Sequence, residues 1–141
     1  MSPESERLVR ESWEQLNPRS DDVVSSFYSR LFAQNPEAAT LFGSTDMLSQ
    51  RRKFAVMLHE IVRVLDHPRV LVSEVADSGR RHVGYGVLDR HYADVGVALL
   101  GAISDGLGPT VKPETISAWR EAYDLLAAVM RRAAAAAAGA Q

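Results

Sequence analysis

The chain has 141 residues, which is the usual size of one domain and long enough to bury a hydrophobic core. Hydrophobic residues make up 46% of it and charged residues 24%, a balance that is typical of soluble globular proteins and excludes a disordered chain. The formal net charge is only −2, whereas domains that bind nucleic acid carry a basic excess, so we expect no nucleic-acid partner.

Cysteine is absent from the sequence, which excludes disulfides, thiolate metal ligands and cysteine nucleophiles. The N-terminal residues lack the basic and then apolar run of a signal peptide. No apolar stretch approaches the roughly 20 residues that are needed to span a bilayer. We therefore expect a cytoplasmic protein with no membrane partner.

Prolines divide the first half of the chain into predicted helices. The order Ser2-Pro3-Glu4 supplies a cap, a first-turn proline and an early acid, which favours a helix start, and this helix should end near residues 17–18. Because a residue before proline is pushed out of the helical region, the next helix, from about residue 20, should end at Asn35-Pro36. A short helix over residues 36–42 and a long one over about 46–65 complete this half.

Three further helices are predicted in the second half, over about 68–82, over about 89–106 and from residue 113 onward, with a turn around Gly84 and Gly86. Alanine is the best helix former, so the run at the C-terminus should extend the last helix and then fray. No strand-like alternation stands out. The sequence therefore predicts an all-α fold of about seven helices, with residues 1–132 as one domain and 133–141 as a helix extension or frayed tail.

Three polar residues fall within apolar helical stripes: His82, Gln50 and Tyr28. Burying an unpaired polar group costs roughly 1–3 kcal/mol, so such positions are informative. Taken singly, each has an ordinary interpretation as a satisfied histidine, a solvated glutamine or a core tyrosine. Taken together, an imidazole that faces a glutamine and a tyrosine from two other helices is the set that a haem pocket needs. The other positions of the three stripes are Leu71, Val75 and Ser78, then Phe54, Leu58 and Ile61, and then Val24, Phe27, Leu31 and Phe32.

The linear pattern around these residues is more specific. One segment has Phe27-Tyr28, Leu31-Phe32, Asn35-Pro36-Glu37 and Leu41-Phe42, and another runs from Gly79 through His82 to Val87. The segments His91-Tyr92-Ala93-Asp94-Val95-Gly96, Leu99-Leu100-Gly101-Ala102-Ile103, and Ala118-Trp119 with Ala122-Tyr123 follow in order. From about Glu4 to Met130, the chain resembles bacterial single-domain haemoglobins and the haemoglobin domain of flavohaemoglobins. The resemblance implies a globin fold.

The resemblance also implies a cofactor and its ligands. Haem b (iron protoporphyrin IX) would be held by His82, whose other ring nitrogen would donate to the carbonyl or hydroxyl of Ser78. The chain would bind O2, CO and NO reversibly at ferrous iron, and Tyr28 and Gln50 match the distal pair whose hydrogen bonds stabilise bound O2. Lys53 and Arg81 are candidates for the haem propionates, with solvated helix charges as the alternative. The residues that would line the haem are Phe42, Phe54, Val87, Tyr92 and Val95.

The remaining histidines are weaker candidates for an iron ligand. His59 should lean outward from its helix, and His67 stands beside a proline in a connection. His91 opens a helix beside Arg90, where an exposed side chain is expected. We therefore expect the iron ligand to be His82 alone among the histidines.

One departure from the flavohaemoglobin pattern stands in the last helix. In flavohaemoglobins a glutamate of this helix and the tyrosine that matches Tyr92 together hold the histidine that matches His82. In this chain the position of that glutamate falls near Ala134, with no acid close by in the sequence. The 141 residues also contain no flavin or nicotinamide domain. Reversible gas binding is the leading function, and the alternatives are an NO dioxygenase that depends on a separate reductase, a haem-based gas sensor, and a haem-free helical module that binds partners.

Overall fold

The computed structural model describes residues 1–84 and 89–139 of the chain, and side chains over residues 1–81 and 90–137. Within these ranges the chain is helical, without a β-strand, which confirms the predicted all-α fold of about seven helices. No described helix is both long and apolar enough to cross a membrane. The elements in chain order are α1 (Pro3–Leu16), the short 3-10 helix η1 (Asn17–Arg19), α2 (Ser20–Gln34), α3 (Pro36–Leu41), α4 (Met47–Arg63), α5 (Pro68–Gly84), α6 (Asp89–Leu107) and α7 (Pro113–Gly139).

Local side-chain caps explain where several of these helices begin. The Asp46 carboxylate accepts hydrogen bonds from the backbone N–H groups of Leu48 (3.1 Å) and Ser49 (3.4 Å), which satisfies donors that have no partner inside α4. Asn35 ends α2 and caps α3, because its side-chain oxygen accepts from the Ala38 N–H at 3.3 Å. Asn35 thus ends one helix and caps the next.

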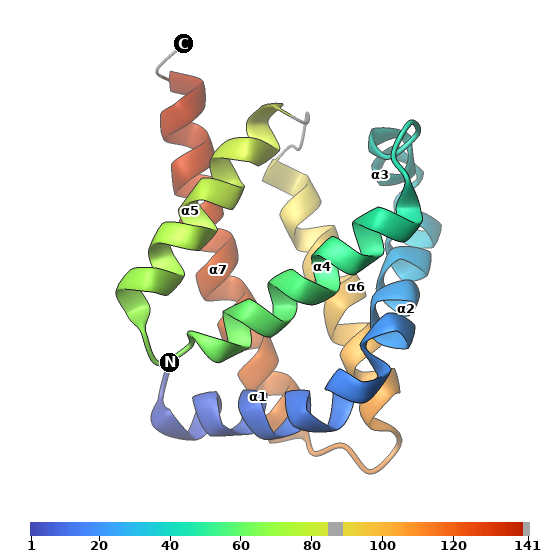
Figure 1. Cartoon of the computed structure of the whole chain (residues 1–141), viewed down its shortest axis with the longest axis vertical. Helices are drawn as coiled ribbons and strands as arrows, with labels where there is room; N and C mark the ends of the chain where they lie inside the picture. Colours follow the sequence, from blue (N-terminus) through green and yellow to red (C-terminus); the bar gives the residue numbers. More distant parts are fainter. Residues whose placement is uncertain (85–88, 140–141) are drawn as a thin grey trace.

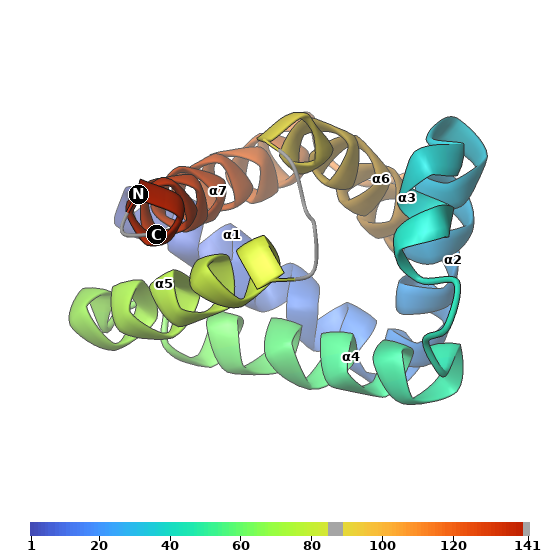
Figure 2. The same cartoon turned by 90° about the horizontal axis from the view of Figure 1, so that it is seen from above.

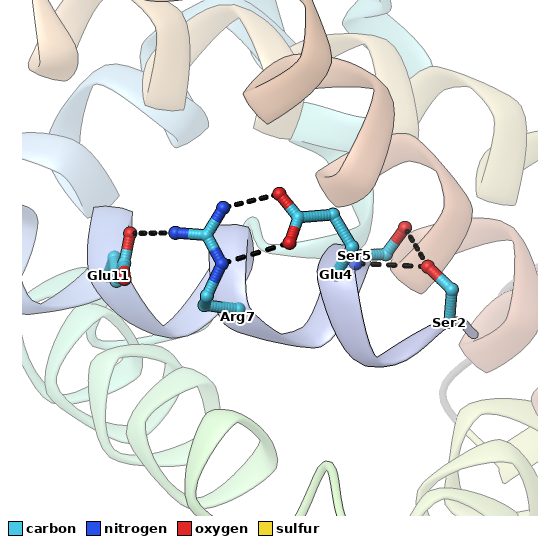
Figure 3. A network of polar contacts seen from close by, with 5 residues as sticks. All are labelled: Ser2, Glu4, Ser5, Arg7 and Glu11. Atoms are coloured by element: carbon cyan, nitrogen blue, oxygen red, sulfur yellow. Dashed lines mark hydrogen bonds and ion pairs between the residues drawn. The ribbon is translucent and has the colours of Figure 1, made fainter.

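The first turns of α1 carry an exposed polar network, which Figure 3 shows in close view. The Ser2 hydroxyl caps the helix by accepting from the Ser5 N–H at 3.1 Å, and the Arg7 guanidinium donates to Glu4 and Glu11 on either side. Hydrogen bonds from Arg7 lower the pKa of the Glu4 carboxyl. Because these groups are solvent-exposed, they contribute mainly to the local order of α1.

The described helices pack against one another around a common core. Figure 2 shows α4 and α5 along one side and α6 and α7 along the other, with α2 and α3 at one end. In Figure 1, α1 crosses below these helices. Helices that are distant in sequence therefore meet, above all α5 with α7 and α2 with α6. The large side chains that form the buried core include Val9, Trp13, Leu16, Val24, Phe27, Ile103 and Trp119.

The first and last helices are joined by a pair of tryptophans. The rings of Trp13 and Trp119 meet edge to face, with centroids 6.3 Å apart. The indole N–H of Trp119 donates to the Ser12 hydroxyl at 2.8 Å, so the polar atom of this buried ring is satisfied. These contacts hold α7 in register against α1.

The start of α6 differs from the expectation at His91, whose side chain is buried rather than exposed, with an exposed fraction of 4%. The reason is tertiary packing, because the α2–α3 junction covers this turn of α6. Arg90 forms an ion pair with Glu37 at 2.5 Å, and the His91 Nε2 atom lies 3.5 Å from the same carboxylate. The Asn35 amide donates to the Asp94 carboxylate at 2.5 Å, which is a further contact between the α2–α3 junction and the start of α6.

Candidate functional site

Tyr28 and Gln50, which lie on different helices, meet in a hydrogen bond. Tyr28 projects from the middle of α2 and is 5% exposed, and Gln50 lies in the first turns of α4 and is half-buried. The Gln50 Nε2 atom donates to the Tyr28 hydroxyl oxygen at 3.1 Å. The fold thus brings together two neutral hydrogen-bonding groups separated by 22 positions in the sequence.

Aromatic rings surround the Tyr28 side chain. Phe42, which follows the last residue of α3, meets Tyr28 edge on at 5.6 Å between centroids, and Phe54 of α4 does so at 5.7 Å. Phe54 also stacks on Phe27, with centroids 4.6 Å apart and planes 17° apart. Phe32 completes the cluster, because its ring lies 5.8 Å from Tyr28 and 5.6 Å from Phe42. The hydroxyl of Tyr28 is therefore held in an apolar aromatic environment.

The electrostatics of this environment keep Tyr28 protonated. Burial raises the pKa of the Tyr28 hydroxyl above its ordinary value, while the Gln50 hydrogen bond and the positive charge of Arg51 oppose that shift. A phenol with a raised pKa remains a hydrogen-bond donor at neutral pH. Arg51 was not among the residues predicted from the sequence, because a neighbour of Gln50 in the helix lies about 100° around the axis from it.

The predicted iron ligand His82 lies in the last turn of α5, and its side chain is outside the described residues. Val87 is also outside them. Earlier in the same helix, Leu71 and Val75 are buried, and Ser78 is half-buried, so the predicted stripe does face the interior up to that point. The predicted roles of His82 and of its Ser78 partner stay predictions.

Tyr92 lies in the first turn of α6 and is held by α7. The Tyr123 hydroxyl donates to the Tyr92 backbone carbonyl, and the Arg131 guanidinium lies over the Tyr92 ring at 5.4 Å from its centroid. The Arg131 contact could not be predicted from the sequence, since it joins two helices. A cavity of about 350 Å³ between α6 and α7 is bordered by these three side chains. Val95, one turn further along α6, is half-buried.

The two cations predicted as candidates for the haem propionates are exposed to solvent, unlike the aromatic cluster around Tyr28. Lys53 and Arg81 are both exposed, Lys53 on α4 and Arg81 in the last turns of α5. No described contact joins either one to Tyr28 or Gln50. Among the other histidines, His59 is exposed, as expected, and His67 in the connection before α5 is exposed as well.

Comparison with known proteins gives consistent results. The sequence profile of the globin family matches residues 25–130 of this chain. The flavohemoprotein of Deinococcus radiodurans is 33% identical over 132 residues, which are 92% of this chain and 33% of that protein. The flavohemoprotein of Bordetella pertussis is 34% identical over 129 residues, which are 90% of this chain and 32% of that protein. The chain therefore spans about a third of the length of the curated relatives that it matches.

Solved structures show the same architecture. An engineered carbene transferase, built on a candidate nitric oxide dioxygenase from Rhodothermus marinus, superposes with a TM-score of 0.89 at 30% identity, and the match covers 99% of this chain and 97% of that one. A bacterial globin from Campylobacter jejuni superposes with a TM-score of 0.83 at 24% identity, over 95% of this chain and 96% of that one. The second likeness is evidence for the fold alone.

Proposed function

The chain belongs to the globin family, and on that premise we propose that it holds haem b through His82 and reversibly binds a diatomic gas on the side of Tyr28 and Gln50. The ligands that this site would take are O2, CO and NO. The observation that carries the proposal is the hydrogen bond between Tyr28 and Gln50 inside an aromatic cluster.

The residues around Tyr28 fit such a group by their chemistry. Gln50 donates to the Tyr28 oxygen, so the Tyr28 O–H proton and the second amide proton of Gln50 are left to donate elsewhere. Phe42 and Phe54 offer flat apolar rings beside these donors, which suits a planar macrocycle. Donors within apolar walls are the surroundings that a polarised gas needs and that a purely structural core does not.

Haem iron, when bound, would supply the atom to which the gas attaches, and the His82 imidazole would hold that iron. The work of this chain would then be to orient donors and to exclude water. Tyr28 is protonated at neutral pH like any phenol, burial raises its pKa further, and the Gln50 hydrogen bond orients the Tyr28 oxygen. The aromatic rings keep the surroundings apolar, which strengthens each hydrogen bond made there.

NO dioxygenation is a second candidate, favoured by the 30% identity to the engineered protein built on a candidate nitric oxide dioxygenase and by the flavohemoprotein relatives. This activity combines O2 with NO to give nitrate, and it needs electrons from outside the site. We propose a reductase outside the globin domain as the electron donor, and the flavohemoprotein relatives, which extend beyond the part that this chain matches, support this.

The test of haem binding compares two histidine variants. His82→Ala should lose the haem absorption band around 400 nm and its shift on adding CO to the reduced protein. His67→Ala is the matched control, because this exposed histidine lies in the connection before α5, and it should give the wild-type spectrum. A His82→Ala protein with the wild-type spectrum would show that the iron ligand is another residue.

A further inference from the structure

The two helices α5 and α7 touch through their backbones at one buried glycine. They lie side by side in both views (Figures 1 and 2). A Cβ atom added at Gly79 would lie 2.4 Å from the Met130 carbonyl oxygen, 2.7 Å from its Cα and 2.9 Å from its carbonyl carbon. Only a glycine permits this approach, because Cβ atoms do not come within 3.0 Å of such neighbours.

The partner of Gly79 distinguishes it from other glycines in the helices. At Gly101 in α6, an added Cβ would meet the Arg30 guanidinium nitrogen at 2.7 Å, which is the far end of a flexible side chain. The Met130 backbone has no such freedom, because it is part of α7. Glycine weakens a helix relative to alanine, so its place in the middle of α5 is explained by the close approach. Gly79 therefore sets the distance between α5 and α7.

The same stretch of α7 also holds the start of α6. Tyr123 donates its hydroxyl proton to the Tyr92 carbonyl, and Arg131 lies over the Tyr92 ring. We call residues 123–131 of α7, which contain these side chains and Met130, the α7 platform. The platform thus contacts the helix that ends with the turn of His82 and the helix that begins just before Tyr92.

From this arrangement we propose that Gly79 is a positioning residue for the iron ligand. Gly79 precedes His82 by three residues, about 4.5 Å along the helix axis, so a displacement at Gly79 carries the last turn of α5 with it. An alanine at this position would force α5 away from the platform by about 1 Å to reach an ordinary contact of 3.4 Å. Because groups behind a metal ligand fix its orientation, a shift of this size would weaken the bond between His82 and iron. This inference rests on the proposed haem ligation by His82.

The test uses Gly79→Ala, with Gly101→Ala as the matched control. Both variants add one methyl group to a helix, but only the first meets backbone atoms. In the reduced, haem-loaded proteins, resonance Raman spectroscopy should show a lower iron–histidine stretching frequency for Gly79→Ala and the wild-type frequency for Gly101→Ala. Haem transfer to an excess of apomyoglobin should be about tenfold faster for Gly79→Ala, which is the usual scale for loss of support behind a metal ligand.

A merely structural role for Gly79 has a different signature. It predicts a lower melting temperature with an unchanged iron–histidine frequency, and that result would overturn the proposal. The contact can also be checked without any substitution, by a nuclear Overhauser effect between the Hα protons of Gly79 and Met130 in the CO-bound wild type. If Gly79→Ala does not keep its helical circular dichroism, this Overhauser effect in the wild type decides instead.

A missing Overhauser effect would then contradict the proposal. Failure of haem ligation by His82 is recognised separately, from a wild-type protein that takes up no haem or from a His82→Ala protein that keeps its spectrum. A wild type that loads haem normally, together with a Gly79→Ala protein of unchanged frequency, refutes only the positioning role.

Discussion

Removal of the Tyr28 hydroxyl should speed the release of O2 far more than that of CO. Bound O2 acquires negative charge and is stabilised by a hydrogen-bond donor, whereas bound CO is stabilised little. Loss of a hydrogen bond to such a charged group is worth roughly 1.5–3 kcal/mol, which corresponds to about 10- to 150-fold in rate. In Tyr28→Phe the freed Gln50 amide, 3.1 Å away in the wild type, can turn toward the gas and offset part of the loss. The O2 dissociation rate of Tyr28→Phe should therefore rise by about tenfold, near the lower end of this range.

Stopped-flow measurements of O2 and CO dissociation from the haem-loaded protein test this expectation. The double variant Tyr28→Phe with Gln50→Leu should approach the upper end of the range, because neither donor remains, and the non-additivity measures their coupling. Tyr123→Phe is the matched control on the other side of the site, and any effect it has should be similar for both gases. Equal acceleration of O2 and CO release in Tyr28→Phe would refute hydrogen bonding and leave a role for ring shape alone.

Three further predictions concern stability and turnover. Burial raises the pKa of Tyr28 and of Tyr123, so as the pH rises these phenols ionise in the unfolded chain before they do in the folded one. The unfolding free energy should therefore be constant below a pH of about 10 and fall above it. In denaturant titrations, the unfolding free energy of Tyr28→Phe should fall less steeply with pH than that of the wild type. Ser12→Ala leaves the buried Trp119 N–H without its acceptor and should lower the unfolding free energy by about 1–3 kcal/mol, whereas the exposed Ser25→Ala should leave it nearly unchanged. The O2-loaded protein should consume NO once and then stop, and NO consumption should continue only when NADH and a flavin reductase are added. Sustained loss of NO with NADH alone would mean that the chain itself accepts electrons from the nucleotide.

The parts of the structure that could be predicted from the sequence depend on local patterns. Proline positions and apolar spacing locate the helices, since both act within one or two turns of the chain. The same periodicity places Tyr28 and Gln50 on inward faces, and the observed hydrogen bond follows once α2 and α4 pack together. The burial of His91 could not be predicted in this way. It depends on Glu37 and Asn35 from a segment more than 50 residues earlier, and no local pattern reports such packing.

The contacts of α7 with α5 and α6 likewise could not be predicted from local sequence patterns. Gly79 is visible in the sequence as a glycine within a helical pattern, which signals a close approach without naming the partner. The partner, the Met130 backbone, emerges only from the packing of α5 on α7. Arg131 over Tyr92 is likewise a contact between two helices that are separate in sequence.

The two sides of the proposed haem site differ in their electrostatics, and this difference bears on what the chain can do with a bound gas. Beside Tyr28 the donors are a phenol that burial keeps protonated and an amide, and both are neutral. On the other side, the Arg131 guanidinium lies over the Tyr92 ring, and Ala134 stands near the position at which flavohaemoglobins carry an acid. A carboxylate partner raises the basicity of a metal-bound histidine, and a cation does not. If His82 holds the iron without a carboxylate partner, as the resemblance led us to expect, its imidazole should donate electrons weakly, which would favour reversible binding of O2 over cleavage of its bond.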